Sequence, residues 1–160
     1  MKKIAGRLRL DLAQFRELEA FAAFGSDLDA ASKAQLERGA RMVELLKQGQ
    51  YSPYSLENQI VSIWAGTSGA LDSVPVADIR RFESELLDFI GRERKEIFTV
   101  IAETKQLEDD TVAKMQSAVD DFKKIFKSTA SQAVNEAAAD ALDGEGVEQI
   151  TRHVPPAVKK

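Results

Sequence analysis

The sequence contains no cysteine and only one histidine, His153, which lies beside Pro155 and Pro156 near the C-terminus. The absence of cysteine excludes a disulfide framework and thiolate metal sites. Because no predicted helix carries a histidine, neither a His-activated nucleophile nor a Glu-x-x-His di-iron site has a basis. We therefore expect no catalytic residue and no metal site in this chain.

The sequence also lacks a glycine-rich phosphate-binding loop. No segment matches G-x-x-x-x-G-K-[ST], the loop whose backbone N–H groups and lysine hold nucleotide phosphates. The nearest glycine cluster, Gly66-Thr67-Ser68-Gly69, has no lysine after it and no predicted strand before it. We interpret it as a turn between helices. We expect no cofactor-binding residue in the chain.

Neither an excess of positive charge nor a long apolar run is present. The 22 basic residues are outnumbered by 26 acidic ones, which gives a net charge of -4 and disfavours binding to nucleic acid. No apolar run approaches the roughly 20 residues that span a bilayer, so direct membrane insertion is not expected. Carboxylate neighbours such as Glu83 and Glu85 are typical of a solvated helix face, and Arg80-Arg81 of local ion pairs.

The aromatic residues divide the chain into two parts. All of them lie between Phe15 and Phe126, and the later residues include only scattered aliphatics, two glycines and two prolines. Such a composition buries too little apolar surface to offset chain entropy. We predict a folded domain over 1–127 and a C-terminal extension over 128–160. The alanine-rich start of the extension favours a helix over 129–142, followed by a disordered end.

Apolar residues in 1–127 recur at spacings of three and four, which predicts an all-α bundle of about six helices without strands. Turn residues set the expected ends. The first helix ends near Gly25 and the second before Gly49. Ser55 caps the third, which ends at Gly66, and Pro75 opens the fourth, which ends at Gly91. The expected buried stripes, in chain order, are Ile4, Leu8, Leu12, Phe15, Leu18 and Ala22; Leu36, Ala40, Val43 and Leu46; Leu56, Ile60, Ile63 and Trp64; Ile79, Phe82, Leu86 and Phe89; Ile97, Val100 and Ile101; and Val112, Met115, Val119, Phe122 and Phe126.

The connection between the first two predicted helices carries an unusual pattern, in which two acidic residues flank a leucine. Its central residues are Gly25, Ser26, Asp27, Leu28 and Asp29. One interpretation is capping, in which Ser26 or Asp29 accepts from free N–H groups of the second helix. The other is a contact loop presented to a partner, because loops on rigid scaffolds often carry binding. The two interpretations are compatible.

Longer strings of the sequence resemble the C-terminal helical domain of F-type ATP synthase α subunits. They cover the folded part of the chain, at residues 4–21, 24–29, 38–41, 44–48, 65–67, 71–76, 80–83 and 121–126. The combination is far more specific than any one motif. Trp64 departs from the tyrosine of many members. The extension over 128–160 resembles those of actinobacterial α subunits, some of which are linked to restraining ATP hydrolysis. Its own sequence is compatible with either a regulatory tether or an inert tail.

The resemblance implies a non-catalytic stator module that packs beside β subunits and contacts the central γ shaft through residues 25–29. The parent complex would make ATP from ADP and phosphate with a proton gradient. It would lie peripherally at the cytoplasmic face of a bacterial plasma membrane. Mg-ATP would bind through residues upstream of Met1, which would correspond to an internal methionine of the parent. The alternative hypothesis is a free-standing helical adaptor that binds partner proteins.

Overall fold

The computed structural model describes residues 2–23 and 28–129, and within these ranges every regular element is a helix. The α-helices are α1 (Lys2–Ala23), α2 (Ala30–Leu45), α3 (Leu56–Ser68), α4 (Ile79–Glu93), α5 (Lys95–Thr104) and α6 (Asp109–Ile125), and a 3-10 turn, η1 (Val76–Asp78), precedes α4. The predicted all-α bundle of about six helices is confirmed.

The chain divides into two units, Met1–Ser128 and Thr129–Lys160. Apart from Thr129, the second unit lies outside the described residues, and so does the helical start expected over 129–142. The assignment of 1–127 as the folded domain and 128–160 as an extension stays a prediction.

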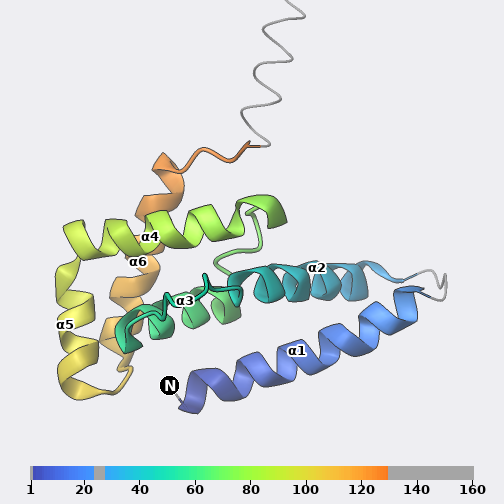
Figure 1. Cartoon of the computed structure of the whole chain (residues 1–160), viewed down its shortest axis with the longest axis horizontal. Helices are drawn as coiled ribbons and strands as arrows, with labels where there is room; N and C mark the ends of the chain where they lie inside the picture. Colours follow the sequence, from blue (N-terminus) through green and yellow to red (C-terminus); the bar gives the residue numbers. More distant parts are fainter. Residues whose placement is uncertain (1, 24–27, 130–160) are drawn as a thin grey trace, which may run out of the picture. The chain divides into compact units, whose positions relative to one another are not determined.

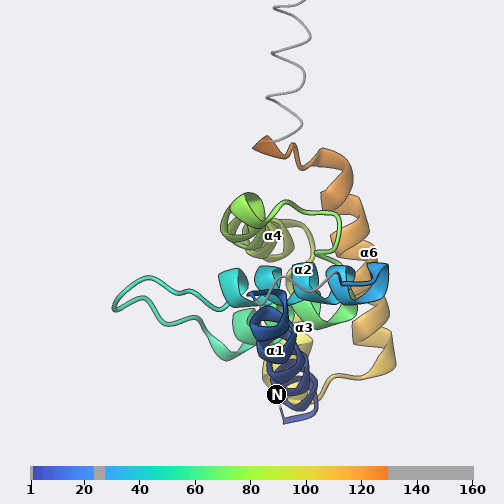
Figure 2. The ribbon, with the colours of Figure 1, turned by 90° about the vertical axis from the view of Figure 1, so that its right-hand side faces the viewer.

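The helices of the first unit form two groups that share α3. Helices α1 and α2 run antiparallel and side by side, and both contact α3 (Figure 1). Helix α4 contacts α2, α3, α5 and α6, and α5 contacts α3 and α6. Figure 2 shows the connection between α2 and α3, drawn in teal, projecting away from the helices. The bundle therefore presents two connections, one at the end of the α1–α2 pair and one at its side.

The hydrophobic core lies mainly between α3, α4, α5 and α6. The most deeply buried large side chains are Phe82, Ile79, Leu86, Ile90, Ile97, Ile101, Met115, Val119, Val61 and, from α2, Met42. The rings of Phe82, Phe89, Phe122 and Phe126 cluster, with the Phe82 and Phe122 centroids 5.1 Å apart in an edge-to-face arrangement. Apart from Val100, which is partly buried, the predicted stripes of α4, α5 and α6 face this core, with Phe89, Val112 and Phe126 at its partly buried edge.

The prediction for the buried face of α2 was wrong. The buried residues are Gly39, Met42 and Leu45, whereas Val43 and Leu46 are 38% and 41% exposed. The cause is Gly39, where the Phe15 ring of α1 fills the space that a Cβ would take. Because glycine has no apolar side chain, the regular spacing of apolar residues does not reveal the buried face of α2 that contains Gly39.

Three predicted helix boundaries need correction, and each concerns a glycine or proline. Gly66 lies inside α3, which ends at Ser68 and is capped by Gly69 at a φ of 87°. The cluster of residues 66–69 is therefore mostly helix rather than a turn. Pro75 precedes η1 instead of opening α4, and Gly91 lies inside α4, which continues to Glu93. The cap at Ser55 is confirmed, since its hydroxyl accepts from the Asn58 N–H at 3.3 Å.

Candidate functional site

The end of the α1–α2 pair carries the loop that the sequence analysis selected. Only Leu28 and Asp29 of its five residues are described; Gly25, Ser26 and Asp27 lie outside the described residues. Leu28 is partly exposed. The Asp29 carboxylate accepts from the Ser32 N–H at 2.9 Å and is the N-cap of α2. A hydrogen bond from the Ser32 side chain, followed by this backbone hydrogen bond, favours the ionised form and lowers the pKa of Asp29 below its ordinary value of 3.8. The capping interpretation is confirmed for Asp29, and the contact role stays a prediction.

The two helices that carry this loop are held together along their length. The Phe15 side chain of α1 lies against the backbone of α2 at Gly39. Nearer the loop, the side-chain amides of Gln14 and Gln35 form a hydrogen bond across the pair. Packing and a polar contact therefore both join α1 to α2.

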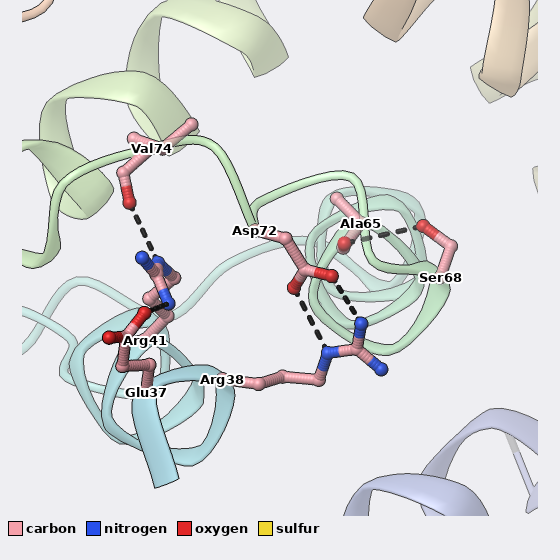
Figure 3. A network of polar contacts seen from close by, with 7 residues as sticks. All are labelled: Glu37, Arg38, Arg41, Ala65, Ser68, Asp72 and Val74. Atoms are coloured by element: carbon pink, nitrogen blue, oxygen red, sulfur yellow. Dashed lines mark hydrogen bonds and ion pairs between the residues drawn. The ribbon is translucent and has the colours of Figure 1, made fainter. Parts of the chain in front are cut away.

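A polar network fixes α2 to the connection between α3 and α4 (Figure 3). The Arg38 guanidinium donates to both carboxylate oxygens of Asp72, with Nε to Oδ1 at 3.0 Å. One turn further, Arg41 Nε donates to the Val74 carbonyl oxygen at 2.8 Å, and its Nη1 lies 3.5 Å from Glu37. The hydrogen bond with Asp72 raises the pKa of the Arg38 guanidinium above its ordinary value. Arg38 and Asp72 also line a hollow of about 530 Å³ beside α1 and α2.

This network explains the spacing of Arg38 and Arg41, which lie one turn apart on α2 and reach the same connection (Figure 3). Both cations are committed to partners within the domain, and the Arg38 pair is bidentate. Residues 38–41 belong to the strings that carry the family resemblance, but their sequence alone predicts no role for them. Their i, i+3 spacing was the available signal, although nothing in the sequence pointed to Asp72 and Val74 as partners.

The expectation that Glu83 lies on a solvated helix face was wrong, because the residue is only 4% exposed. The Ser62 hydroxyl of α3 donates to Glu83 Oε1, and the Tyr54 hydroxyl is a further hydrogen-bond partner. Burial raises the pKa of Glu83 above its ordinary value of 4.5, against the opposing effect of these hydrogen bonds and of Arg80. Burial, followed by the charge of Glu83, also raises the pKa of Tyr54. This carboxyl therefore joins α3, α4 and the base of the projecting connection.

Of Arg80 and Arg81, Arg81 forms local ion pairs, as predicted, whereas the ion pair of Arg94 joins two helices. Arg81 lies 3.3 Å from Glu85 and 3.7 Å from Asp78, and its guanidinium lies 4.5 Å from the Phe126 ring centroid. Arg94 pairs with Asp121 of α6 at 3.1 Å. These contacts connect α4 to the last turn of α6 and to the residues that follow it.

The described residues contain no group of three or more His, Asp or Glu side chains placed to hold a metal ion. Within the same ranges, no helix is both long enough and apolar enough to cross a membrane. Over the described residues, the chain is an all-α domain whose polar side chains cap helices and cross-link them. It therefore belongs to the class of small helical-bundle domains.

Comparison with known proteins places this domain in a family. Residues 1–122 match the model of the family described as ATP synthase alpha/beta chain, C terminal domain, and the chain belongs to that family. It is 62% identical over 150 residues to the ATP synthase subunit alpha of Parafrankia sp. (strain EAN1pec), which covers 93% of this chain and 27% of the relative. It is 60% identical over 152 residues to that of Thermobifida fusca (strain YX), covering 94% of this chain and 28% of the relative.

A third relative, the ATP synthase subunit alpha of Frankia casuarinae, is 60% identical over 162 residues, covering 99% of this chain and 29% of the relative. The chain thus spans little more than a quarter of the length of the curated relatives that it matches. The resemblance to actinobacterial α subunits is confirmed.

Proposed function

We propose that this chain is the C-terminal domain of an ATP synthase α subunit and acts as a non-catalytic stator module of the rotary complex. The observation that carries the proposal is 62% and 60% identity to α subunits over more than nine-tenths of the chain. The parent complex makes ATP from ADP and phosphate with a proton gradient. As part of its catalytic head, the module lies peripherally at the cytoplasmic face of the bacterial plasma membrane.

In the complex, the domain packs beside β subunits and its residues 25–29 contact the γ shaft. Three features support this role for the loop. It lies at the end of two helices joined by the Phe15–Gly39 contact, Asp29 anchors its C-terminal end to α2, and Leu28 is partly exposed between acidic neighbours. A stator surface beside a turning shaft needs such a fixed, small contact.

Cross-linking tests the rotor contact directly. The chain has no cysteine, so Ser26→Cys in the whole α subunit adds a single thiol to this domain. In a complex of α, β and γ subunits with cysteines placed along the shaft, oxidation should join Ser26→Cys to γ. Ser117→Cys, on the exposed face of α6, is the matched control and should not form this bond. Equal cross-linking of both variants, or of neither, would contradict the contact.

The proposal also concerns what the domain lacks by itself. The phosphate-binding loop and the residues that hold Mg-ATP belong to the upstream part of the parent chain, so the 160-residue chain alone should neither bind nor hydrolyse the nucleotide. Isothermal titration with Mg-ATP checks this, and a stoichiometric micromolar signal would contradict it. Co-purification with β and γ from the native complex separates the stator module from a free-standing helical adaptor.

A further inference from the structure

A second hollow of the domain, the Trp64 cleft, lies apart from the residues 25–29 discussed above. It has a volume of about 460 Å³ and is formed by the N-terminal turns of α1, the end of α3, and the α5–α6 connection with the start of α6. Its apolar lining comes from Ile4, Trp64, Leu107 and Val112. A cleft of this size lies within the range of about 300–1,000 Å³ that is usual for ligand sites.

Two exposed cations, Arg7 and Lys105, stand at the rim of the Trp64 cleft. Among the described residues, neither of them forms an ion pair with a carboxylate. The only carboxylate that lines the cleft is Asp109, so two cations and one anion leave a net charge of +1. This local charge is opposite to the net charge of -4 of the whole chain. The cleft therefore combines an apolar floor with a positive rim.

The backbone at Lys105 is unusual for a lysine. Its φ is 53°, in the left-handed region, and it is the C-cap of α5, where its N–H donates to the Ile101 carbonyl at 3.0 Å. Glycine is the ordinary residue in this conformation because it has no Cβ to clash. A lysine there accepts a strained backbone and places a cation beside the cleft. Strain of this kind in a cleft wall is a reason to look for a ligand.

We propose that the Trp64 cleft docks an acidic amphipathic helix of a partner protein. An apolar side chain of the partner would lie against the Trp64 indole, and carboxylates one turn to either side would pair with Arg7 and Lys105. Complementarity with the two cations at the rim of the cleft selects an acidic partner. The proposal does not depend on the stator role.

The only tryptophan of the chain lines this cleft, which gives the test a direct readout. The probe is a short synthetic helical peptide with leucines at spacings of three and four and glutamates elsewhere. Titrated into the 160-residue chain, it should change the Trp64 fluorescence saturably, and added salt should weaken the binding because the charges are exposed. A control peptide with lysines in place of the glutamates should leave the fluorescence unchanged.

A variant at Lys105 separates binding from folding. Lys105→Gly removes the cation and relaxes the left-handed backbone, so the fold should be kept or stabilised while peptide affinity falls by about fivefold. Adding Arg7→Gln should bring the loss to about tenfold or more. Lys33→Gln removes the same charge near the start of α2, at the opposite end of the antiparallel α1–α2 pair, and should leave the affinity unchanged (Figure 1).

Four outcomes would overturn the proposal. The first is equal binding of the two peptides, and the second is unchanged peptide affinity in the double variant Lys105→Gly, Arg7→Gln. The third is self-association of the chain, seen as quenching of the Trp64 fluorescence without peptide. The fourth is saturable binding of octanoate at Trp64 with no response to the acidic peptide, which would identify the site as one for a small carboxylate. Light scattering distinguishes self-association, and circular dichroism verifies that each variant is folded.

Discussion

Helix α1 and helices α4 to α6 differ in how completely they are buried. On α1 the inward residues Ile4, Leu8 and Phe15 each keep 8% of their surface exposed, and Leu10 and Phe21 are 59% and 61% exposed on the outer side. Between α4, α5 and α6, the large core side chains are almost entirely buried. The first region is an edge helix with an accessible outer side, whereas the second is the interior that carries most of the stability.

The two regions also use different interactions to hold their helices. Around α2, the helices approach closely at Gly39 and Gly66 and are cross-linked by Arg38 and Arg41. In the α4–α6 region, edge-to-face phenylalanine rings and aliphatic side chains fill the space. Both features with a proposed contact role, residues 25–29 and the Trp64 cleft, adjoin α1. Helix α1 packs on α2 and α3, and these two helices in turn pack against the α4–α6 region.

The largest effect should come from the aromatic core. Phe82→Ala removes a fully buried ring that contacts Phe122 and Phe126, and should lower the free energy of unfolding by about 3–5 kcal/mol. Phe21→Ala, the same change on the outer side of α1, should stay within about 0.5 kcal/mol. Urea unfolding followed by circular dichroism measures both. Similar losses for the two variants would show that the two regions do not differ as described.

A glycine pair tests close packing in the α1–α2 region. Gly39→Ala places a methyl group in the space occupied by Phe15 and should cost about 1–3 kcal/mol, because helix α1 must shift. Gly6→Ala lies in the same region, on an exposed part of α1 with nothing within 4 Å of its Cβ position. It should stabilise the protein by about 0.5–1 kcal/mol, as expected for a helix interior. Opposite signs in thermal unfolding would confirm the role of Gly39, and equal signs would contradict it.

The buried helix faces of the two regions were predicted from the sequence with unequal success. In α4 to α6, regular spacing of large apolar residues was enough to identify the buried faces, such as that of Met115, Val119 and Phe122. In α2 the same method selected Val43 and Leu46, because it cannot register a face built around glycine. Helix ends at glycines were also misplaced. The sequence alone does not show whether a glycine ends a helix with a positive φ or lies inside a helix and makes room for a neighbouring one.

The candidate sites were predicted only where the signal is local. Asp29 precedes α2 and caps it three residues on, so its role could be read from a short segment. The partners of Arg38 and of Glu83 lie 34 and 21 residues away in the chain, at Asp72 and Ser62, and depend on how helices cross. The Trp64 cleft likewise joins residues from both ends of the first unit.

A smaller effect is expected at Glu83, which joins the two regions through Ser62 and Tyr54. Its raised pKa means that the folded protein binds this proton more tightly than the unfolded chain. The stability gained from the protonated group is complete below about pH 4.5 and is lost as the pH rises through the raised pKa. Glu83→Gln keeps the volume and an acceptor for Ser62 but removes the titration.

The stability of Glu83→Gln relative to the parent should therefore rise with pH across this window and then level off. Urea unfolding of both proteins at several pH values from 4 to 8 measures the difference. Other carboxylates, such as Asp29 and Asp121 with their lowered pKa values, titrate equally in both proteins and cancel. A difference that does not depend on pH would show that Glu83 is not destabilised in its charged form.

The smallest effect should come from the Arg38–Asp72 pair. Its side chains are 41% and 43% exposed, so solvent screens the interaction, although two parallel hydrogen bonds fix its geometry. A double-mutant cycle with Arg38→Ala and Asp72→Ala should give a coupling of about 0.2–1 kcal/mol. The same cycle for Lys114 and Asp110, an exposed pair within α6, should give a smaller coupling. We expect the Arg38–Asp72 coupling to be the larger because this pair joins α2 to the connection between α3 and α4. The Lys114–Asp110 pair lies within one helix. A larger coupling in α6 would mean that cross-linking is no more important around α2 than elsewhere.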